Sequence, residues 1–333
     1  MIKIGILSFA HHHGEAYISN LRHMEGVELL GVVDDDPMRG QTIAAQNKAH
    51  YFHTYEDLLE AKPEGVIICT ENNRHRPVVE MVASRGIHVL CEKPIATTLE
   101  DAQAIVEVCD KAGVYLMTAF PMRFSAPLLE IKARLDHGDF GDIYCFNATN
   151  QGELPTKHRG WFVDPKLAGG GAIMDHTVHL VDIMRWFTGS EVESMYARSN
   201  RIFHAEEVEV ETGAVEMLTF ENGVFATIDA SWSRPPYWPT WGGLIFEMVT
   251  QRGAVVVDAF RQNLNVYRHE WQRSNWSYWG SDMNHAMVSE FASAIRENRP
   301  PNVTGMDGLR AVEATLAAYE SDRMGQTVQV KTT

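Results

Sequence analysis

The first third of the chain alternates short apolar runs with helical segments, and this alternation limits the fold more than any other feature of the sequence. The apolar runs have the length of strands, and helix start signals such as Pro37 and Thr98 follow two of them. Buried strands that alternate with helices are typical of a parallel sheet with helices on both faces. We therefore predict an α/β, doubly wound fold with strands at residues 2–7, 27–33, 66–69, 87–91 and 114–118 and helices at 15–24, 37–48, 75–85 and 99–112.

A sheet of this kind binds its ligand outside the carboxyl ends of its strands, where the strand order switches. Asp34 follows the second strand, where a dinucleotide-binding fold places the carboxylate that binds the adenosine ribose. An acid there favours NAD, because it repels the 2′-phosphate of NADP. Arg39 could stack on the adenine or accept that phosphate, so NADP is not excluded. The alternative role of Asp34 is a helix cap, although Asp36 is better placed for capping. The other residues expected to contact a cofactor at this edge are Thr70, Asn72, His75, Glu92 and Lys93.

The first turn of this sheet lacks the glycines of the dinucleotide fingerprint G-x-G-x-x-G. Ser8, Ala10 and His13 stand at the three glycine positions, and Gly14 comes one place later. Ser8 and Ala10 are small, so the backbone can still approach a pyrophosphate, and we expect all three residues to contact the cofactor. The three consecutive histidines at 11–13 could donate to phosphate or contact a substrate. Adjacent side chains point in different directions, so we do not expect one metal ion to use all three.

Residues 169–182 read GGGAIMDHTVHLVD, a glycine-rich loop followed by a helical segment. Asp175 and His179 are four residues apart, which places both on one face of an α-helix. A carboxylate one turn from an imidazole can orient the ring and stabilise its protonated form. The glycines indicate a loop that approaches a ligand closely. A histidine with a purely structural role is the alternative, and this stretch alone does not decide between them.

Several motifs occur together in one order along the chain. Glu92-Lys93-Pro94 follows the strand at 87–91, which itself comes after Thr70-x-Asn72-x-x-His75. Arg123-Phe124 closes the segment 117–124, and the glycine-rich loop with D-x-x-x-H follows. Over nearly its whole length the chain resembles the glucose–fructose oxidoreductase, inositol dehydrogenase and MocA-like family. The glycine-poor first turn departs from the family pattern.

The resemblance implies an N-terminal Rossmann domain, residues 1–121, and a C-terminal α/β domain, residues 122–333, with a large, open, mostly antiparallel sheet. It also implies NAD(P) as cofactor and a sugar, inositol or related polyol as substrate. The catalytic lysine of the family corresponds to Lys93, its histidine to His179 and the aspartate before it to Asp175.

These residues suggest a reaction in which a secondary alcohol loses a hydride to the nicotinamide, or the reverse. His179 would take the hydroxyl proton and Asp175 would orient it. Lys93 would stabilise the developing alkoxide, and Glu92 would fix Lys93 or the ribose. Pro94 makes a cis peptide accessible after Lys93. Three further residues are expected to contact the substrate: Arg123, Trp161 and His176.

The second half of the chain has a different pattern, with alternating strands and turns such as Asn222-Gly223 and Arg252-Gly253. We predict strands at 143–149, 192–203, 213–220, 224–232, 244–250, 254–258 and 264–269, followed by helices at 282–298 and 308–319 with a turn at 302–307 between them. The alternation indicates a sheet with one covered and one open face. An open apolar face is typically an oligomer interface, so we expect a homodimer or homotetramer.

Net charge and cysteine content limit the kinds of binding partner and the cellular compartment that we expect. A formal net charge of −15 argues against nucleic acid or an anionic membrane surface as a general partner. No apolar stretch approaches the length of a membrane span, and no signal peptide is recognisable at the first residues. The cysteines form no C-x-x-C pair, so we expect reduced thiols in a cytoplasmic protein and no zinc site built from them.

Two other functions are compatible with the sequence. One is a non-catalytic sensor of dinucleotide or sugar, which the glycine-poor first turn would favour and the retained Lys93, Asp175 and His179 argue against. The other is metal-assisted chemistry using Asp175, His179 and a histidine of the first turn. The preferred interpretation is a dehydrogenase without a metal.

Overall fold

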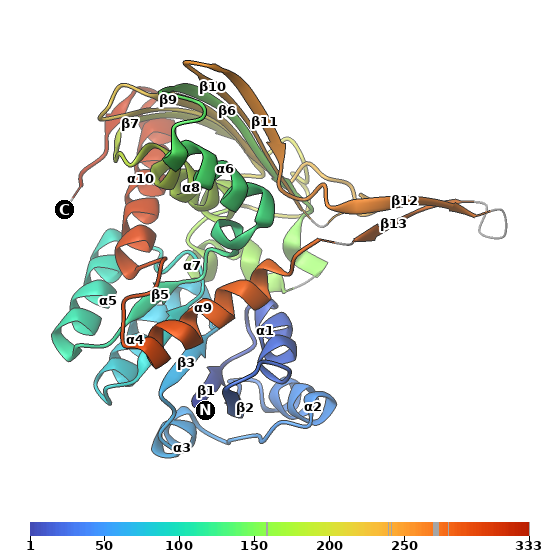
Figure 1. Ribbon diagram of the computed structural model, residues 1–333, viewed down its shortest axis with the longest axis vertical. Coiled ribbons are helices and arrows are strands. Elements are labelled where there is room, and N and C mark those ends of the chain that lie inside the picture. Colours follow the sequence, from blue (N-terminus) through green and yellow to red (C-terminus); the bar gives the residue numbers. More distant parts are fainter. Residues whose placement is uncertain (158, 239, 241, 269–272, 279, 333) are drawn as a thin grey trace.

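A 5-stranded parallel sheet forms the lower half of the molecule in the computed structural model (Figure 1). The structure describes residues 1–332 except 158, 239, 241, 269–272 and 279. The strand order is β2-β1-β3-β4-β5, and every pair is parallel. The strands are β1 (Ile2–Leu7), β2 (Val27–Val33), β3 (Gly65–Ile68), β4 (His88–Cys91) and β5 (Leu116–Thr118). The predicted doubly wound parallel sheet is confirmed.

Both faces of this sheet are covered, because alternate residues of its strands enter two separate cores. Ile67 and Leu90 pack on the side of the first helix, whereas Ile68 and Cys91 pack on the opposite side. The helices of this half are α1 (His13–Leu21), α2 (Pro37–Asn47), α3 (Tyr55–Glu60), α4 (His75–Ala83) and α5 (Leu99–Ala112).

Local capping sets the boundaries of several of these helices. The Thr98 hydroxyl accepts from the backbone N–H of Asp101 and starts α5 at the predicted residue. Asp36 caps α2 directly before Pro37, as its position predicted. The short helix α3 was not predicted, although Thr54 and Asp57 form a capping box at its start.

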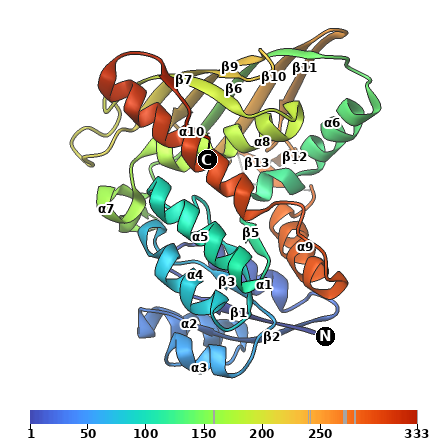
Figure 2. The ribbon, with the colours of Figure 1, turned by 90° about the vertical axis from the view of Figure 1, so that its left-hand side faces the viewer.

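A second, 7-stranded sheet forms the upper half, with strand order β11-β10-β6-β9-β8-β7-β14. The pair β6–β9 is parallel and the other pairs are antiparallel, which confirms the prediction of a mostly antiparallel sheet. Figure 2 shows helices on one side of this sheet and none on the other. The strands are β6 (Ile143–Gly152), β7 (Val192–Asn200), β8 (Gly213–Phe220), β9 (Phe225–Ser231), β10 (Gly242–Thr250), β11 (Gly253–Asp258) and β14 (Val328–Gln329), and the covering helices are α6 (Ala126–His137), α8 (Val178–Thr188) and α10 (Gly305–Met324).

The C-terminal helices return to the first half of the molecule. Phe291 and Ile295 of α9 (Met283–Glu297) lie so close to Gly65 of β3 that a Cβ at this glycine would meet their side chains at 2.8–2.9 Å. Helix α10 begins three residues earlier than predicted, inside the segment expected to be a turn. The reason is a capping box between Thr304 and Asp307, which starts the helix at Gly305.

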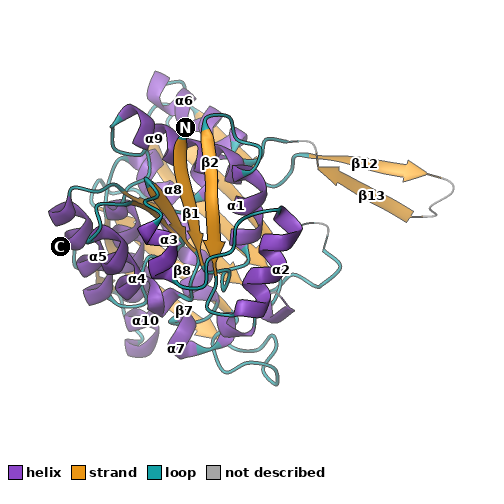
Figure 3. Cartoon of the chain, turned by 90° about the horizontal axis from the view of Figure 1, so that it is seen from below, coloured by secondary structure: helices purple, strands orange, loops and turns teal. Residues whose placement is uncertain are grey.

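A two-stranded arm, β12 (Asn263–Arg268) and β13 (Arg273–Tyr278), projects away from the body (Figure 3). The sequence predicted its first strand to end at residue 269, which lies outside the described residues, and did not predict the second. The remaining short elements are α7 (Pro165–Ala168) and 3-10 turns at Asn72–Arg74, Pro121–Phe124, Pro155–Lys157 and Gly160–Val163. No helix in the described ranges is long and apolar enough to cross a membrane.

Candidate functional site

A cavity of about 300 Å³ lies between the two halves of the molecule, at the carboxyl edge of the first sheet. Its walls are apolar with a few convergent polar groups, which is the usual character of a small-molecule site. Both halves contribute to the lining: His11, His12, His13, Lys93, Pro121 and Met122 from the first, and Asn150, Gly152, Glu153, Phe162, Asp175, His176, His179, Leu244, Phe260, Met283 and Asn284 from the second.

Lys93 and Asp175 form an ion pair at this cavity. Lys93 Nζ donates to Asp175 Oδ1 at 2.7 Å, while Trp232 Nε1 donates to Asp175 Oδ2 at 3.1 Å. His176 Nε2 lies 3.4 Å from the same oxygen. Burial alone would raise the pKa of Asp175, but the charges of Lys93 and His176 and the two hydrogen bonds hold that pKa well below its usual range. Asp175 is therefore an anion that holds the lysine.

His179 lines the same cavity and lies beside the ring of Phe120, with 5.9 Å between the ring centroids. Burial and the charge of Lys93 hold the pKa of His179 well below its ordinary value. The ring is therefore neutral at pH 7 and able to accept a proton. Its Nδ1 is buried and has no hydrogen-bond partner among the described residues.

The predicted pairing of Asp175 with His179 differs from what is observed. Residues Ile173–Thr177 form a π-helical turn before α8, so a spacing of four residues no longer stacks two side chains as in an α-helix. Asp175 faces Lys93 and Trp232, and no hydrogen bond to His179 is found among the described atoms. We therefore replace the predicted role of Asp175, which was to orient His179, by the positioning of Lys93.

The start of the π-helical turn is held by two side chains from distant parts of the chain. Glu211 Oε1 accepts from the backbone N–H groups of Gly171 at 2.9 Å and Ile173 at 3.1 Å. The hydroxyl of Tyr319 donates to the same oxygen at 2.6 Å and accepts from Met174 N at 3.1 Å. These partners satisfy the amides that every helix leaves unpaired at its first turn.

This contact also explains the run of three glycines differently from our prediction. A Cβ at Gly170 would lie 1.8 Å from the Tyr319 hydroxyl, and one at Gly171 would lie 2.1 Å from the Glu211 carbonyl oxygen. Gly169 ends α7 in the left-handed conformation, with φ 86°. Close approach of Tyr319 and Glu211 therefore accounts for Gly170 and Gly171, and the left-handed conformation accounts for Gly169.

The second sheet supports the far end of the π-helical turn. Thr177 Oγ1 donates to Glu216 Oε1 at 2.7 Å, and Asn150 Nδ2 donates to the carbonyl oxygen of His176 at 3.2 Å. Glu216 is fully buried, and burial raises its pKa to about 8. At pH 7 this carboxyl is therefore mostly neutral.

The first turn takes a glycine-like shape without its glycines. Ser8 has φ 70°, in the left-handed region, and its hydroxyl accepts from Ala10 N at 3.1 Å. A segment of the second half closes over this turn, because Trp161 Nε1 donates to the carbonyl oxygen of Ala10 at 2.9 Å. The Trp161 ring stacks on Phe162 at 4.0 Å, and Phe162 lines the cavity in its place. The structure does not place Trp161 where we expected a substrate contact.

Glu92 faces the first turn rather than the ammonium group of Lys93. Its Oε1 accepts from the Tyr17 hydroxyl at 2.5 Å and lies 3.1 Å from His13 Nδ1. Burial alone would raise the pKa of Glu92, but His13, Tyr17 and Lys93 lower it overall. Glu92 thus joins a cluster at the first turn instead of contacting the Lys93 ammonium group.

The other predicted cofactor contacts divide into two groups. Asp34 and Arg39 form a two-bonded ion pair at the end of β2, with both N–O distances 2.6 Å. Thr70 and His75 are fully buried behind the sheet edge. His75 Nδ1 lies 3.0 Å from the carbonyl oxygen of Pro94, next to the cis peptide between Lys93 and Pro94.

Asn72 joins the two halves, because its Nδ2 donates to the Ala168 carbonyl oxygen at 2.9 Å. Thr70, Asn72 and His75 therefore support the sheet edge and do not line the cavity.

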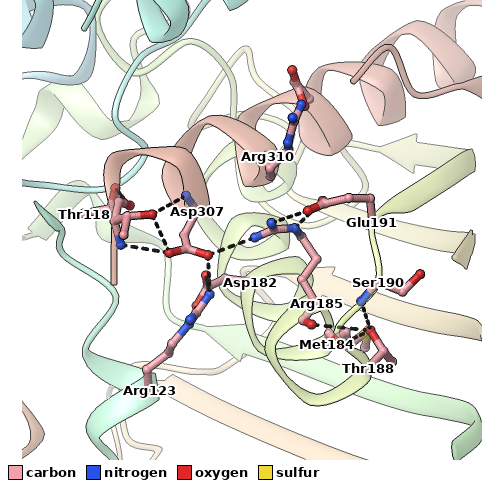
Figure 4. A network of polar contacts seen from close by, with 12 residues as sticks. Thr118, Arg123, Asp182, Met184, Arg185, Thr188, Ser190, Glu191, Asp307 and Arg310 are labelled. Carbon is pink, nitrogen blue, oxygen red and sulfur yellow. Dashed lines mark hydrogen bonds and ion pairs between the residues drawn. The ribbon is translucent and has the colours of Figure 1, made fainter. Parts of the chain in front are cut away.

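Arg123 belongs to a polar network (Figure 4) and does not line the cavity. Its guanidinium donates to both carboxylate oxygens of Asp182, at 2.8 and 2.5 Å, and to Asp307 at 2.9 Å. Arg185 joins Asp307 to Glu191 in the same network. Arg123 thus fastens α8 to α10, and the structure does not bring it to the substrate side of the cavity.

Sequence reasoning missed several residues of this site: Tyr17, Asn150, Glu211, Glu216, Trp232 and Tyr319. Tyr17 was the most accessible of them, because it follows His13 by one helical turn on α1. The others come from strands, a helix and loops of the second half, and no local pattern connects them with the glycine-rich loop.

Comparison with known proteins agrees with this architecture. Residues 2–120 match the model described as an oxidoreductase family with an NAD-binding Rossmann fold, and residues 128–256 match the GFO/IDH/MocA C-terminal domain. The chain is 26% identical to the myo-inositol 2-dehydrogenase of Thermotoga maritima, with 96% of each chain covered. It is 28% identical to the 1,5-anhydro-D-fructose reductase of Ensifer adhaerens, with 92% of each covered.

Among solved structures, GenD2 from gentamicin A biosynthesis in complex with NAD superposes with a TM-score of 0.89 at 22% identity, covering 99% of this chain and 97% of that one. The myo-inositol 2-dehydrogenase of Lactobacillus plantarum gives a TM-score of 0.86 at 18% identity, with 99% of both chains covered. These likenesses concern the fold, and the two family models cover most of the chain. The protein belongs to the Gfo/Idh/MocA family of NAD-binding oxidoreductases.

Proposed function

We propose that the protein is a dehydrogenase that oxidises a secondary alcohol of a sugar, inositol or related polyol, or reduces the corresponding ketone. The observation that carries this proposal is the meeting of Lys93, Asp175 and His179 at one cavity beside the carboxyl edge of the first sheet. Curated relatives named for inositol, anhydrofructose and apiose conversion support the substrate class.

The residues at the sheet edge fit a nicotinamide dinucleotide. Ser8 supplies the left-handed turn that glycine usually supplies, and the small side chain of Ala10 would let a pyrophosphate come close to the backbone before α1. Asp34 offers a carboxylate at the end of β2, although Arg39 neutralises it and keeps NADP as a possible cofactor. His13 would also contact the cofactor, which accepts or donates the hydride when bound.

The side chains of the cavity would handle the proton and the reacting oxygen. His179 is neutral at pH 7, so it can take the hydroxyl proton during oxidation. Lys93 lines the same cavity, paired with Asp175, and its positive charge would stabilise negative charge on the substrate oxygen. Asp175 fixes Lys93 through their 2.7 Å contact, and His176 lines the cavity as a substrate contact.

The test begins with fluorescence titration of the purified protein with NADH and NADPH, followed by a screen of inositols, aldoses and sugar acids for cofactor reduction. We expect tighter binding of one dinucleotide and turnover on at least one polyol. Binding without any turnover would favour the sensor function, whereas no binding of either dinucleotide would contradict the dehydrogenase.

We also propose that the protein acts in the cytoplasm as a homodimer or homotetramer joined through the open face of the second sheet. Exposed apolar side chains on that face support this proposal, including Val215, Met217, Phe225 and Val256. Sedimentation analysis of the wild-type protein and of Val256→Lys would test it, because a charge at this interface should dissociate the oligomer.

A further inference from the structure

His11, His13 and Glu92 form a cluster at the first turn whose ligand atoms all lie within 4.8 Å of one another. His11 Nε2 lies 3.8 Å from Glu92 Oε2, and His13 Nδ1 lies 3.1 Å from Glu92 Oε1. Alternate residues of the H-H-H run, which extend from one side of the turn, thus meet a carboxylate from the end of β4. His12 is not part of this cluster.

Hydrogen bonding within the cluster leaves one buried nitrogen unused. His11 is 1% exposed, and its Nε2 has no hydrogen-bond partner in the part of the chain that the structure describes, although it lies 3.8 Å from Glu92 Oε2. Buried polar atoms are nearly always paired, so an unpaired imidazole nitrogen 3.8 Å from a carboxylate oxygen indicates room for a bridging ligand. The ordinary partners of such a nitrogen are a proton acceptor, a water molecule or a metal ion.

The surroundings of the cluster have the character of support around a metal site. The Tyr17 hydroxyl donates to Glu92 Oε1, and the backbone N–H of Lys93 donates to Glu92 Oε2 at 3.2 Å. Such outer contacts fix the orientation of a ligating carboxylate. Glu92 is fully buried, and the net effect of its neighbours is to lower its pKa, so it is an anion.

We propose that His11 Nε2, His13 Nδ1 and Glu92 bind a divalent first-row transition metal ion such as Zn²⁺. Two imidazoles and one carboxylate are a ligand set that such ions accept while keeping coordination positions open. His11 and His13 line the same cavity as Lys93 and His179, so the open positions would face a bound substrate. An ion held there could then polarise an oxygen of a substrate bound in this cavity.

Metal binding would change two hydrogen bonds of the cluster. His11 Nδ1 accepts from the backbone N–H of His13 at 3.2 Å, which places the proton of the neutral ring on Nε2. Coordination through Nε2 moves this proton to Nδ1 and breaks that long hydrogen bond. The contact between His13 Nδ1 and Glu92 is likewise replaced by bonds to the ion. We therefore expect binding to shift the histidine NMR signals of His11 and His13 together.

The experiment measures metal binding without cofactor or turnover, so its outcome is independent of the proposed dehydrogenase activity. The full-length protein is freed of metal by chelation and then titrated with Zn²⁺ by calorimetry and with Co²⁺ by visible absorption. We expect one ion per chain and a Co²⁺ spectrum typical of nitrogen and oxygen ligands. His11→Ala and His13→Ala should each lower the affinity by roughly a hundredfold or more, since outer-shell changes alone lower it 10- to 100-fold.

His12→Ala is the matched control, because it removes a histidine of the same run that the cluster does not use. Its metal affinity should equal that of the wild type. His11→Gln and His13→Gln keep a polar side chain, and thermal unfolding of each variant shows whether it is folded. Absence of stoichiometric binding in the wild type would overturn the proposal. So would binding that survives in the folded His11 and His13 variants, because the ion would then lie elsewhere.

A third result would assign the histidines a different role. If the His11 and His13 variants lose affinity for NADH while the wild type binds no metal, the cluster contacts the cofactor and the metal proposal is wrong. If metal binds as expected but no polyol is turned over, the proposed dehydrogenase function fails and the metal site stands.

Discussion

Two ion pairs, Lys93–Asp175 and Arg123–Asp182, hold the segment that carries His179, and they differ in what surrounds them. Lys93 and Asp175 meet at the edge of the cavity, where the Asp175 side chain is 24% exposed. Arg123 and Asp182 meet in the interior, where the Asp182 side chain is 1% exposed and Asp307 adds a second acceptor. One cation therefore faces space that a ligand can enter, and the other does not.

The pKa values of the two carboxyl groups, Asp175 and Asp182, are shifted in opposite directions. The pKa of Asp175 lies well below its usual range, because Lys93, His176 and Trp232 together outweigh burial. The pKa of Asp182 is raised, because burial and the nearby Asp307 outweigh the opposing effect of Arg123. A sealed ion pair contributes little stability when intact but is expensive to break, whereas a pair beside a cavity can exchange a partner for a ligand. The comparison therefore predicts a structural role for the Arg123–Asp182 pair and a catalytic role for Lys93 of the other pair.

The largest expected effect is on turnover, from Lys93→Ala. Loss of the cation at the cavity removes the stabilisation of developing charge on the substrate oxygen and should lower kcat roughly 100- to 1,000-fold. Affinity for NADH should change little, and the loss of stability should be smaller than in Arg123→Ala, because Asp175 is partly exposed and keeps its hydrogen bond from Trp232. The exposed Lys111→Ala is the control. Wild-type turnover in Lys93→Ala would show that Lys93 has no catalytic role.

Arg123→Ala should act on stability instead. The change leaves Asp182 buried without its cation, so the free energy of unfolding should fall by about 3–5 kcal/mol. Urea denaturation followed by circular dichroism measures this loss, with the exposed Arg134→Ala as control. If Arg123→Ala kept its stability but lost affinity for substrate, Arg123 would belong to the site after all.

Glu216 is a buried carboxyl group that contacts the π-helical turn through Thr177. No cation among the described residues forms an ion pair with it. Its pKa in the folded protein is about 8, above the ordinary value of 4.5. A raised folded pKa gives a stability contribution that is complete below pH 4.5 and is lost as the pH rises through 8. Between pH 6 and pH 8 the loss should approach about 2–3 kcal/mol.

Glu216→Gln tests this expectation, because glutamine keeps an acceptor for Thr177 and cannot ionise. The variant should equal the wild type near pH 4.5 and become progressively more stable than it up to pH 8. Parallel stability curves for the two proteins over this range would show that Glu216 does not ionise on unfolding as argued.

The sequence predicted the first half of the molecule well because local signals determine it. Helix α5 spans Leu99–Ala112 as predicted, and each strand of the first sheet is a short, mainly apolar run. The residues at the cavity were also identified in part, since Lys93, Asp175, His176 and His179 all line it.

The geometry of the π-helical turn at Ile173–Thr177 could not be predicted from the local sequence. The π-helical turn depends on Glu211 and Tyr319, which are 40 and 148 residues away from Gly171 in the chain. A π-helix closes each hydrogen bond over one residue more than an α-helix does. Asp175 therefore contacts Lys93 and not His179. Arg123 and Trp161 were misplaced for a similar reason: a charge or an aromatic ring near a motif does not reveal whether its partner is a ligand or another part of the protein.

The smallest expected effect tests whether the support of the π-helical turn reaches the ion pair. Tyr319→Phe removes the hydroxyl that accepts from Gly171 N and Met174 N and should lower stability by about 1 kcal/mol. If this support positions Asp175, kcat should also fall several-fold, roughly what loss of about 1 kcal/mol of transition-state stabilisation gives, while KM stays near its wild-type value. Ser321→Ala is the matched control, since Ser321 lies two residues further along α10 and bonds Ala197 and Gln326 instead. A similar fall of kcat in both variants would mean that turnover follows general stability, whereas a fall in Tyr319→Phe alone would show that the geometry of the Lys93–Asp175 pair is set from α10.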